Sequence, residues 1–264
     1  MDFRNLKNKL DHLYDTFDFT DRLKNDPISF PHRYERREDI EVAGLVASAF
    51  AFGRVERFMP VIEKLLDLLG PSPFLTLRQR GVQDLSGELG KLHYRFYTGK
   101  DVVLFIGVLS SLIGKYGDLR EAFKRHMRGE DLRGMLEGVS RECVETGSKL
   151  RKSLGFGNVQ RSGFHFFFPS PRNGSSCKRL NLFLRWMVRK RDIDFGVWDF
   201  ISPSKLVIPL DAHISRIGRC LGLTNRKTPD WKMAVEITES LKRFDENDPL
   251  RYDFALCHQG IQGV

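Results

Sequence analysis

The sequence predicts a mainly α-helical protein, and three observations lead to this prediction. Apolar residues recur at intervals of three and four along most of the chain, which is the period of an amphipathic helix. Capping residues precede several of these stretches and glycines follow them. No segment shows several alternating strands bounded by turn residues. With 264 residues, 41% of them hydrophobic, the chain can bury a sizeable core as one large domain or two small lobes.

The first strong helical stretch covers residues 40–70. Glu38 and Asp39 precede it, as acids often do in a first turn, and Gly70 ends it. A break near Phe52-Gly53 divides it, so two helices are predicted. Residues 101–117, DVVLFIGVLSSLIGKYG, are apolar on nearly all sides and are predicted to form a core helix with Asp101 as N-cap. The segments LREAFKRHMR, MLEGVSRECVETGSKLRKSL and WKMAVEITESLKRF carry charge on one face and are predicted to be surface helices.

Residues 155–176, GFGNVQRSGFHFFFPSPRNGSS, form the least helical region. Their glycine, proline, serine and asparagine content favours turns, so a loop leading into a helix is predicted. Ser175 or Ser176 would be the N-cap of a helix that starts near Cys177. Backbone N–H groups at such a helix start can bind a phosphate, although an ordinary capped helix explains the pattern equally well.

A second helix start lies in IPLDAHISRIGRCLGL. Pro209 prevents a helix from continuing through it, Asp211 stands at the N-cap position, and Gly222 ends the helix. The predicted apolar stripe is formed by Ile214, Ile217 and Leu221. Asp211 can be explained as a cap alone, but a carboxylate held at a helix N-terminus also suits the stabilisation of a nearby cation.

The charge and cysteine content narrow the choice of partners and cofactors. The net charge of +9 indicates an anionic partner, such as a nucleic acid. The four cysteines are far apart and form no C-x-x-C pair, so neither a metal nor any other cofactor is predicted. The charged, amphipathic beginning is unlike a secretory leader, and we expect a cytoplasmic, nucleoid-associated protein without a membrane partner. The last residues, GIQGV, are compatible with a natural chain that continues further.

The two helix starts resemble a known family. PLDAHISRIGRCLGL is similar to the V-D-T-H-V-x-R-V-x-x-R-L-G segment of the helix-hairpin-helix GPD superfamily of DNA glycosylases, with its catalytic aspartate at Asp211. CKRLNLFLRWMV is similar to the G-K-T-A-x-x-x-L helix start and places the Schiff-base lysine at Lys178. Weaker similarities in LVASAFAFGRVERF, HYRFYTG and YDFALCHQGI extend the resemblance from about Glu38 onward.

The chain also departs from the commonest members of this superfamily. PSPRNGSS stands where they have the hairpin L-P-G-V-G, and Phe50 stands where many have glutamine. The spacing of 33 residues between Lys178 and Asp211 is closer to the archaeal 8-oxoguanine DNA glycosylase branch. An uncharacterised bacterial and archaeal family with the string CKRLNxFLRWMVR is the other near resemblance.

The resemblance implies a two-lobed, monomeric glycosylase with its active site in the cleft between the lobes. The expected parts are a core lobe at about residues 38–150, a hairpin and catalytic lobe at about 151–223, and C-terminal helices at 224–264. The implied function is removal of an oxidised purine, 8-oxoguanine first among them, from damaged double-stranded DNA, with lyase activity through Lys178 and charge stabilisation by Asp211. The residues expected to bind DNA are Arg172, Asn173, Gly174, Ser175, Ser176, Arg179, Arg185, His213 and Arg216. Those expected in the base pocket are Phe50, Arg54, Trp186 and Trp198.

Several of these residues have a second interpretation. Arg185 and Arg189 are four apart on one helix face, so they can bind phosphates or neighbouring acids. The cluster Phe164, Phe166, Phe167 and Phe168 favours core packing, with a wedge into the DNA stack as the alternative.

Two rival functions remain at this stage. A noncatalytic helical DNA- or RNA-binding module would leave Lys178 exposed and far from Asp211. A metal-dependent nuclease would use acids such as Glu35, Glu38 and Asp39, although the sequence contains no compact set of metal ligands.

Overall fold

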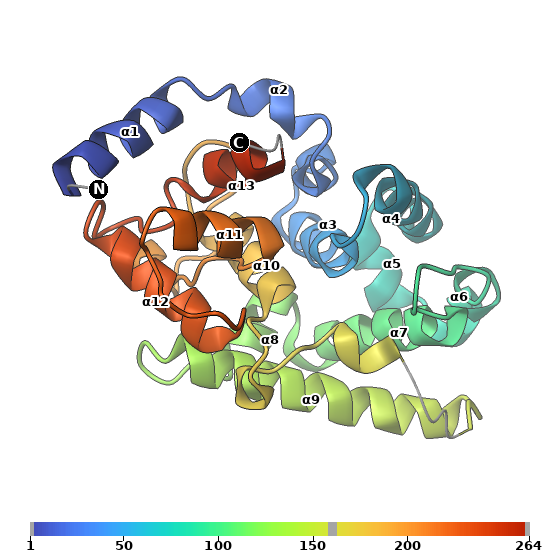
Figure 1. Ribbon diagram of the computed structural model, residues 1–264. Helices are drawn as coiled ribbons and strands as arrows, with labels where there is room; N and C mark the ends of the chain where they lie inside the picture. The colour runs from blue at the N-terminus through green and yellow to red at the C-terminus, as the bar shows by residue number, and fades with distance from the viewer. Residues whose placement is uncertain (1–2, 158–162, 262–264) are drawn as a thin grey trace. The chain divides into compact units, whose positions relative to one another are not determined.

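The computed structural model describes residues 3–157 and 163–261, and within these residues regular structure is helical, with no strand (Figure 1). The predicted mainly α class is therefore confirmed. Asn158–Ser162 of the predicted loop and the last three residues of GIQGV lie outside the described residues. No helix in the described ranges is both long and apolar enough to cross a membrane.

The chain divides into two compact units. Unit 1 combines Met1–Lys24 with Ser170–Val264, and unit 2 is Asn25–Pro169. These boundaries differ from the predicted lobes, because the loop after residue 150 belongs to unit 2 as far as Pro169. One tie that holds it there is the hydroxyl of Ser140, which donates to the carbonyl of Phe168 at 2.7 Å.

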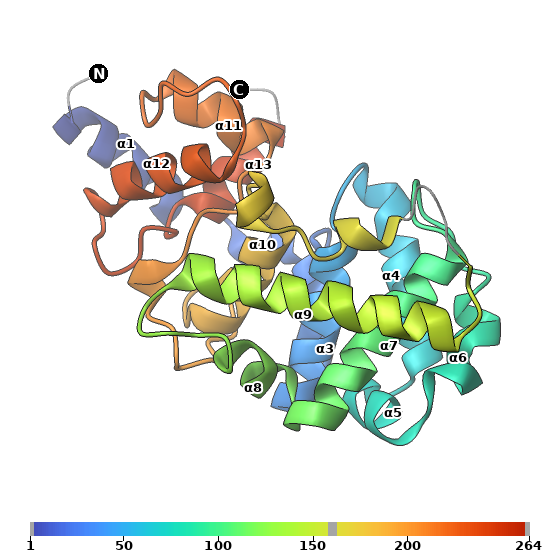
Figure 2. The ribbon, with the colours of Figure 1, turned by 90° about the horizontal axis from the view of Figure 1, so that it is seen from below.

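Unit 2 is built around the apolar helix α7 (Gly99–Tyr116), which contacts α5, α6, α8 and α9 (Figure 2). Its N-cap is Thr98, and Asp101 occupies the third helical position of a capping box, so the prediction of Asp101 as the cap is wrong by three residues. The remaining elements of unit 2 are η1 (Pro27–Ser29), η2 (Pro31–Arg33), α3 (Arg37–Phe50), α4 (Val55–Leu69), α5 (Pro73–Gln79), α6 (Val82–Leu89), α8 (Leu119–Lys124), α9 (Leu132–Ser153) and η3 (Gly163–Phe166).

The predicted break between two helices near Phe52-Gly53 is confirmed, since α3 ends at Phe50 and α4 begins at Val55. Glu38 and Asp39 lie in the first turn of α3, as predicted. Asp39 is buried and accepts hydrogen bonds from the Ser72 hydroxyl and from the backbone N–H of Phe74, which joins α3 to the start of α5. Gly70 is the C-cap of α4, also as predicted.

Unit 1 joins the N-terminal helices to the last third of the chain. Its elements are α1 (Phe3–Asp15), α2 (Phe19–Leu23), η4 (Pro171–Asn173), α10 (Lys178–Val188), η5 (Pro203–Lys205), α11 (Ala212–Cys220), α12 (Trp231–Lys242) and α13 (Asp253–Ile261). Figures 1 and 2 show α1 beside the segment between α12 and α13. The Phe3 ring stacks on Phe244 at 4.7 Å, and the Tyr252 hydroxyl donates to Asp11 at 2.6 Å. These contacts hold the two ends of the chain in one unit.

Candidate active site

Lys178 is the first residue of α10, in unit 1. The 3-10 turn Pro171–Asn173 is followed by Gly174 with φ 77° and by Cys177 with φ 52°, both in the left-handed region. Cys177 is the N-cap residue, and its side chain makes no capping bond. The prediction of a serine cap is therefore wrong. Ser175 instead accepts a hydrogen bond from the N–H of Cys177, an arrangement that tightens the turn before the helix.

Asp211 is the N-cap of α11, as predicted. Its Oδ1 accepts a hydrogen bond from the backbone N–H of Ile214 at 2.9 Å. The residues before it, 206–210, are buried and lie outside any helix, and the N–H of Ile208 donates to the hydroxyl of Thr238 on α12. The Ser176 hydroxyl donates to the carbonyl of Leu210 at 3.3 Å. This last bond ties the approach to α10 to the approach to α11, so the two helix starts are held side by side.

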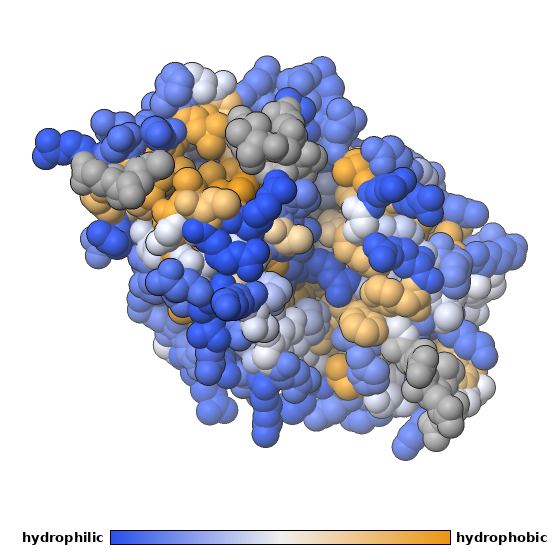
Figure 3. Space-filling model, in the orientation of Figure 1, coloured by the Kyte–Doolittle hydropathy of each residue, from blue (hydrophilic) through white to orange (hydrophobic). Residues whose placement is uncertain are grey.

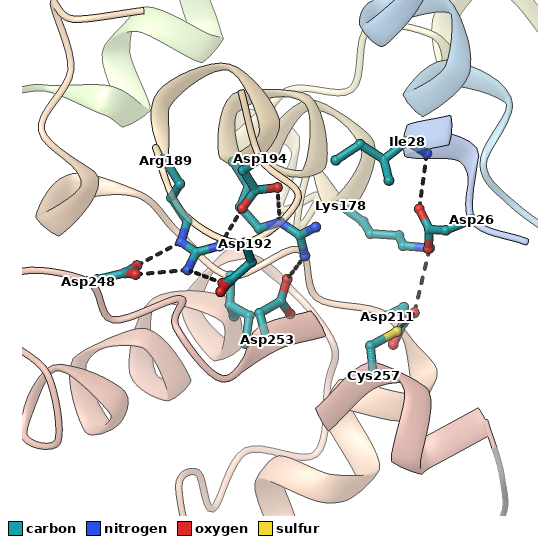
Figure 4. Close-up of polar contacts among 12 residues, drawn as sticks. Asp26, Ile28, Lys178, Arg189, Asp192, Asp194, Asp211, Asp248, Asp253 and Cys257 are labelled. Atoms are coloured by element: carbon teal, nitrogen blue, oxygen red, sulfur yellow. Dashed lines mark hydrogen bonds and ion pairs between the residues drawn. The ribbon is translucent and has the colours of Figure 1, made fainter. Parts of the chain in front are cut away.

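The structure brings Lys178 and Asp211 together (Figure 4). Lys178 Nζ lies 3.5 Å from Asp211 Oδ2, although the two residues are 33 positions apart in the sequence. The side chains are 31% and 17% exposed, so a solute can reach both. The Sγ of Cys257, on α13, lies 3.9 Å from the same carboxylate oxygen. An amine and a carboxylate therefore share an accessible site at two helix N-termini, where the helix dipoles favour negative charge.

A buried cluster of charges surrounds Arg185 on α10 and Arg189 at the C-cap of that helix. Arg185 contacts Asp194 and, at 2.6 Å, Asp253, the first residue of α13. Arg189 forms a two-point contact with Asp248 at 2.8 Å on both arms and also contacts Asp194 (Figure 4). Burial lowers the pKa of both guanidinium groups, but the surrounding carboxylates more than offset this effect, so both pKa values lie above the ordinary one.

The prediction that Arg185 binds DNA is corrected by this cluster. Its side chain is only 3% exposed and its charge is already neutralised by two carboxylates. Of the two interpretations of the Arg185 and Arg189 spacing, binding of neighbouring acids is the one confirmed. The pairing links α10 to α13 and thereby helps to position Lys178, at the start of the first helix, and Cys257, on the second.

Three residues predicted for the base pocket are also corrected, because they belong to packed cores. Phe50 is fully buried in unit 2 against Tyr97 and Phe167. Trp186 and Trp198 are buried in unit 1, where Trp198 packs edge-on against Phe183. The fourth residue, Arg54, is exposed at the start of α4.

The other residues predicted to bind DNA remain accessible on unit 1. Arg172, Asn173, Gly174 and Arg216 are exposed, and Ser175, Ser176, Arg179 and His213 are partly exposed. The loop that contains Gly174 is joined to the start of α12, because the N–H of Trp231 donates to the carbonyl of Gly174 at 3.3 Å. The loop that leads to Lys178 therefore has a defined path within unit 1.

Sequence reasoning missed Cys257, Asp253 and Asp194. A signal for the first two existed, because residues four apart on a helix share a face and Asp253 and Cys257 have this spacing. No local signal indicated that this face would meet α10, since Arg185 and Asp253 are 68 residues apart.

Two of the three acids named for the rival nuclease hypothesis, Glu38 and Asp39, have other contacts. Glu38 pairs with Arg36 and Arg37, and Asp39 holds the start of α5. In the described ranges, no group of three or more histidine, cysteine, aspartate or glutamate side chains is arranged to hold a metal ion.

The fold and the site thus define a mainly helical protein with an accessible lysine–aspartate pair at two adjoining helix starts. The family described as "Protein of unknown function (DUF2400)" matches residues 26–262, so the chain belongs to this family. No curated protein and no solved structure matches the chain.

Proposed function

We propose that this protein is a DNA glycosylase of the helix-hairpin-helix class that removes an oxidised purine, with 8-oxoguanine as the first candidate, and has associated AP lyase activity. The observation that carries the proposal is the 3.5 Å approach of Lys178 Nζ to Asp211 Oδ2. An amine nucleophile and a carboxylate at one accessible point are what cleavage of an N-glycosidic bond through a Schiff base requires. Damaged double-stranded DNA is the proposed partner, and the net charge of +9 supports an anionic one.

The proposed chemistry assigns a separate task to each group. Lys178, once it has given up its proton, attacks C1′ of the deoxyribose as the bond to the base breaks, and the base leaves with a proton. Asp211 stabilises the positive charge that develops on the sugar. Opening of the sugar ring gives a protonated Schiff base between Lys178 and C1′. Loss of a proton from C2′ then expels the 3′ phosphate by β-elimination, and water releases the sugar fragment and restores the lysine.

The surroundings of the pair support these roles. The N–H of Ile214 fixes one carboxylate oxygen of Asp211 and leaves the other directed at Lys178. The buried ion pair between Arg185 and Asp253 anchors α10, so the amine is placed by a rigid helix. Exposed Arg172 and Arg216 can bind phosphates on the same unit.

The test is borohydride trapping on duplexes that carry 8-oxoguanine, uracil or an abasic site. Borohydride reduces the Schiff base to a stable secondary amine, so a covalent protein–DNA adduct is expected on the 8-oxoguanine duplex. Lys178→Gln should abolish the adduct. Asp211→Asn should slow base removal by about a hundredfold or more, because the developing charge loses its stabilising partner.

The chain supplies matched controls for both variants. Lys232 lies in the first turn of α12 and Asp230 caps that helix, where its side chain accepts from the N–H of Met233 at 2.8 Å. Lys232→Gln and Asp230→Asn therefore reproduce the loss of a first-turn lysine and of an aspartate cap, and both should trap normally. Base removal without any adduct would replace the proposal by a monofunctional glycosylase. Tight DNA binding with no base removal would favour the noncatalytic DNA- or RNA-binding module.

A further inference from the structure

Unit 2 carries a group of three aromatic side chains at its surface, which we call the aromatic patch: Phe52, which is partly exposed, and Phe96 and Phe166, which are exposed. Phe96 is 43% exposed and Phe166 is 55% exposed. The rings of Phe52 and Phe96 stack with their centroids 5.2 Å apart, and those of Phe96 and Phe166 lie 4.7 Å apart. Neighbouring exposed apolar side chains of this kind form a candidate binding site.

Buried rings support the patch from below. Phe96 packs edge-on against Tyr97, Tyr97 stacks on Phe167 at 3.8 Å, and Phe167 stacks on Phe105 at 4.3 Å. Phe105 belongs to α7, at the centre of the unit. The exposed rings are thus the outer end of an aromatic column that reaches the core. Rings held in this way lose little conformational entropy when a ligand stacks on them.

A tight turn presents the patch. The backbones of Tyr94 and Tyr97 exchange two hydrogen bonds, and Arg95 between them has φ 52°, in the left-handed region. The Tyr94 hydroxyl donates to the carbonyl of Phe52. Gly53, with φ 88°, makes this approach possible, because a Cβ there would lie 2.7 Å from the Tyr94 hydroxyl. The turn and the end of α3 are therefore fixed to each other.

Arginines surround the patch, and they are not neutralised. The Arg95 guanidinium lies over the Phe52 ring at 5.6 Å. Burial raises the pKa of Tyr94, while the positive charges of Arg95 and Arg57 oppose the rise. Among the residues that the structure describes, Arg54, Arg57 and Arg95 have no ion pair with a carboxylate. Glu56 is the only acid in residues 51–60.

We propose that the aromatic patch binds an unpaired nucleobase by stacking, while Arg57 and Arg95 contact the flanking phosphates. Aromatic faces beside uncompensated cations are what a flexible nucleic-acid strand recognises without regard to sequence. In Figure 3, hydrophobic side chains lie beside strongly hydrophilic ones over the part of unit 2 that contains the yellow η3 turn of Figure 1. An apolar peptide would find the same rings, but the arginines would then contribute nothing. The inference deepens the proposed function, since it names a second contact for the nucleic acid, and it does not depend on the chemistry at Lys178.

The test compares two single-stranded probes by fluorescence anisotropy. One is a short, undamaged oligodeoxynucleotide, and the other has the same length but carries abasic tetrahydrofuran units throughout. The variant is Phe96→Ala with Phe166→Ala, and since both side chains are exposed the protein should fold normally. We expect the Kd for the base-bearing strand to rise about fivefold or more, and the Kd for the abasic strand to stay within about twofold.

The matched control is Phe3→Ala. Within the described ranges, Phe3 is the other exposed large hydrophobic side chain, 37% exposed, and it also lies under a guanidinium, that of Arg243 at 4.7 Å. Its loss should leave both Kd values unchanged. Equal weakening by Phe3→Ala, equal weakening on the abasic strand, or no weakening at all would each overturn the proposal. A probe with 5-iododeoxyuridine adds a direct readout, because irradiation should cross-link it to Phe96 or Phe166.

The outcome separates this proposal from the proposed enzyme function. If Lys178→Gln fails to trap DNA while the double phenylalanine variant binds the base-bearing strand normally, the glycosylase proposal survives and the stacking proposal fails. If no substrate is trapped but binding depends on Phe96 and Phe166, the reverse holds.

Discussion

Arg185 on α10 and Arg189 at its C-cap carry the same charge as the arginines around the aromatic patch, but the two sets have opposite surroundings. Arg185 and Arg189 are 3% exposed and lie among four aspartates. Arg57 and Arg95 are exposed, and neither has an ion pair with a carboxylate within the described parts of the chain. The two sets of arginines therefore differ in what they can bind: Arg185 and Arg189 hold helices of unit 1 together, whereas Arg57 and Arg95 can meet a polyanion. Net charge indicates an anionic partner but does not show which arginines meet it.

The largest loss of unfolding free energy should come from a substitution in the buried cluster around Arg185 and Arg189. Asp194→Ala leaves both Arg185 and Arg189 short of a partner at a place where their side chains are only 3% exposed. We expect unit 1 to lose about 3–5 kcal/mol of unfolding free energy, because a buried charge is left uncompensated. Urea unfolding measures the loss. Asp194→Asn, which keeps the shape and one acceptor, should lose less, and a loss below about 1 kcal/mol in Asp194→Ala would contradict the role assigned to the cluster.

A substitution at Gly53 should strain the contact between the end of α3 and the turn that carries Arg95, without touching the buried cluster of unit 1. Gly53→Ala puts a Cβ 2.7 Å from the Tyr94 hydroxyl and 2.9 Å from Arg95 Nη1, at a φ of 88°. We expect a loss of about 1–2 kcal/mol together with weaker binding of single-stranded DNA. Gly114→Ala is the control, since that helical glycine of α7 has nothing within 4 Å of the added Cβ. It should raise stability slightly, and equal losses in the two variants would contradict the strain argument.

The partly exposed ion pair between Glu142 and Lys115 should have an intermediate effect on stability, and this effect should depend on pH. Burial by itself raises the pKa of Glu142, but hydrogen bonds from Lys115, Tyr116 and His126 lower it from the usual 4.5 to about 2. Because the folded pKa is the lower one, the stabilisation is present above pH 4.5 and is lost as the pH falls from about 4.5 to about 2. Glu142→Gln should cost about 1 kcal/mol at neutral pH, after allowance for solvent screening, and nothing near pH 2.

Urea unfolding at several pH values provides the measurement for Glu142→Gln. Glu137→Gln is the control on the same helix, since Glu137 has a single exposed partner, Arg133. Its effect should stay within about 0.5 kcal/mol at every pH. A gap between native protein and Glu142→Gln that persists unchanged below pH 2 would show that packing, and not charge, is responsible.

The smallest effect on stability should come from substitution of an exposed arginine beside the aromatic patch. Arg57→Gln removes a cation without an ionic partner, so unfolding free energy should change by no more than about 0.5 kcal/mol. Binding of single-stranded DNA should still respond, with the salt slope reduced by about 0.7 for one lost phosphate contact. Arg33→Gln is matched, because Arg33 is already paired with Glu63 in two contacts, and it should leave the slope unchanged. Equal slopes in all three proteins would contradict the difference drawn between the two sets of arginines.

The features that the sequence predicted correctly are local. The break at Phe52-Gly53, the Gly70 end of α4 and the Asp211 cap all depend on residues within one or two turns of each other. The Asp101 cap was misplaced because Thr98 and Asp101 both carry side chains that can cap, and only the chain geometry decides which one stands first.

Two questions stayed open at the level of the sequence. One depends on contacts with residues far along the chain, and the other depends on the geometry of a 3-10 turn. The spacing of Arg185 and Arg189 suits phosphates and aspartates equally, and the acids that decide the matter include Asp248 and Asp253, some sixty residues away. In the phenylalanine cluster, Phe164 and Phe167 are three apart in and after a 3-10 turn and therefore point the same way, into the core. Phe166 lies off that face, and it alone of the cluster is exposed.

The interrupted course of unit 1 has a consequence for synthesis of the protein. Helix α1 is synthesised before unit 2, but residues that it packs against, such as Phe244 and Tyr252, are synthesised after unit 2. At bacterial to eukaryotic elongation rates, the intervening stretch of unit 2 takes roughly 7–30 s to translate. All residues of unit 2 are synthesised before the second part of unit 1, so unit 2 can fold on the ribosome before α1 and α2 have the residues that they pack against. Lys178 and Asp211 are both synthesised after unit 2, and the 3.5 Å approach of their side chains forms within unit 1.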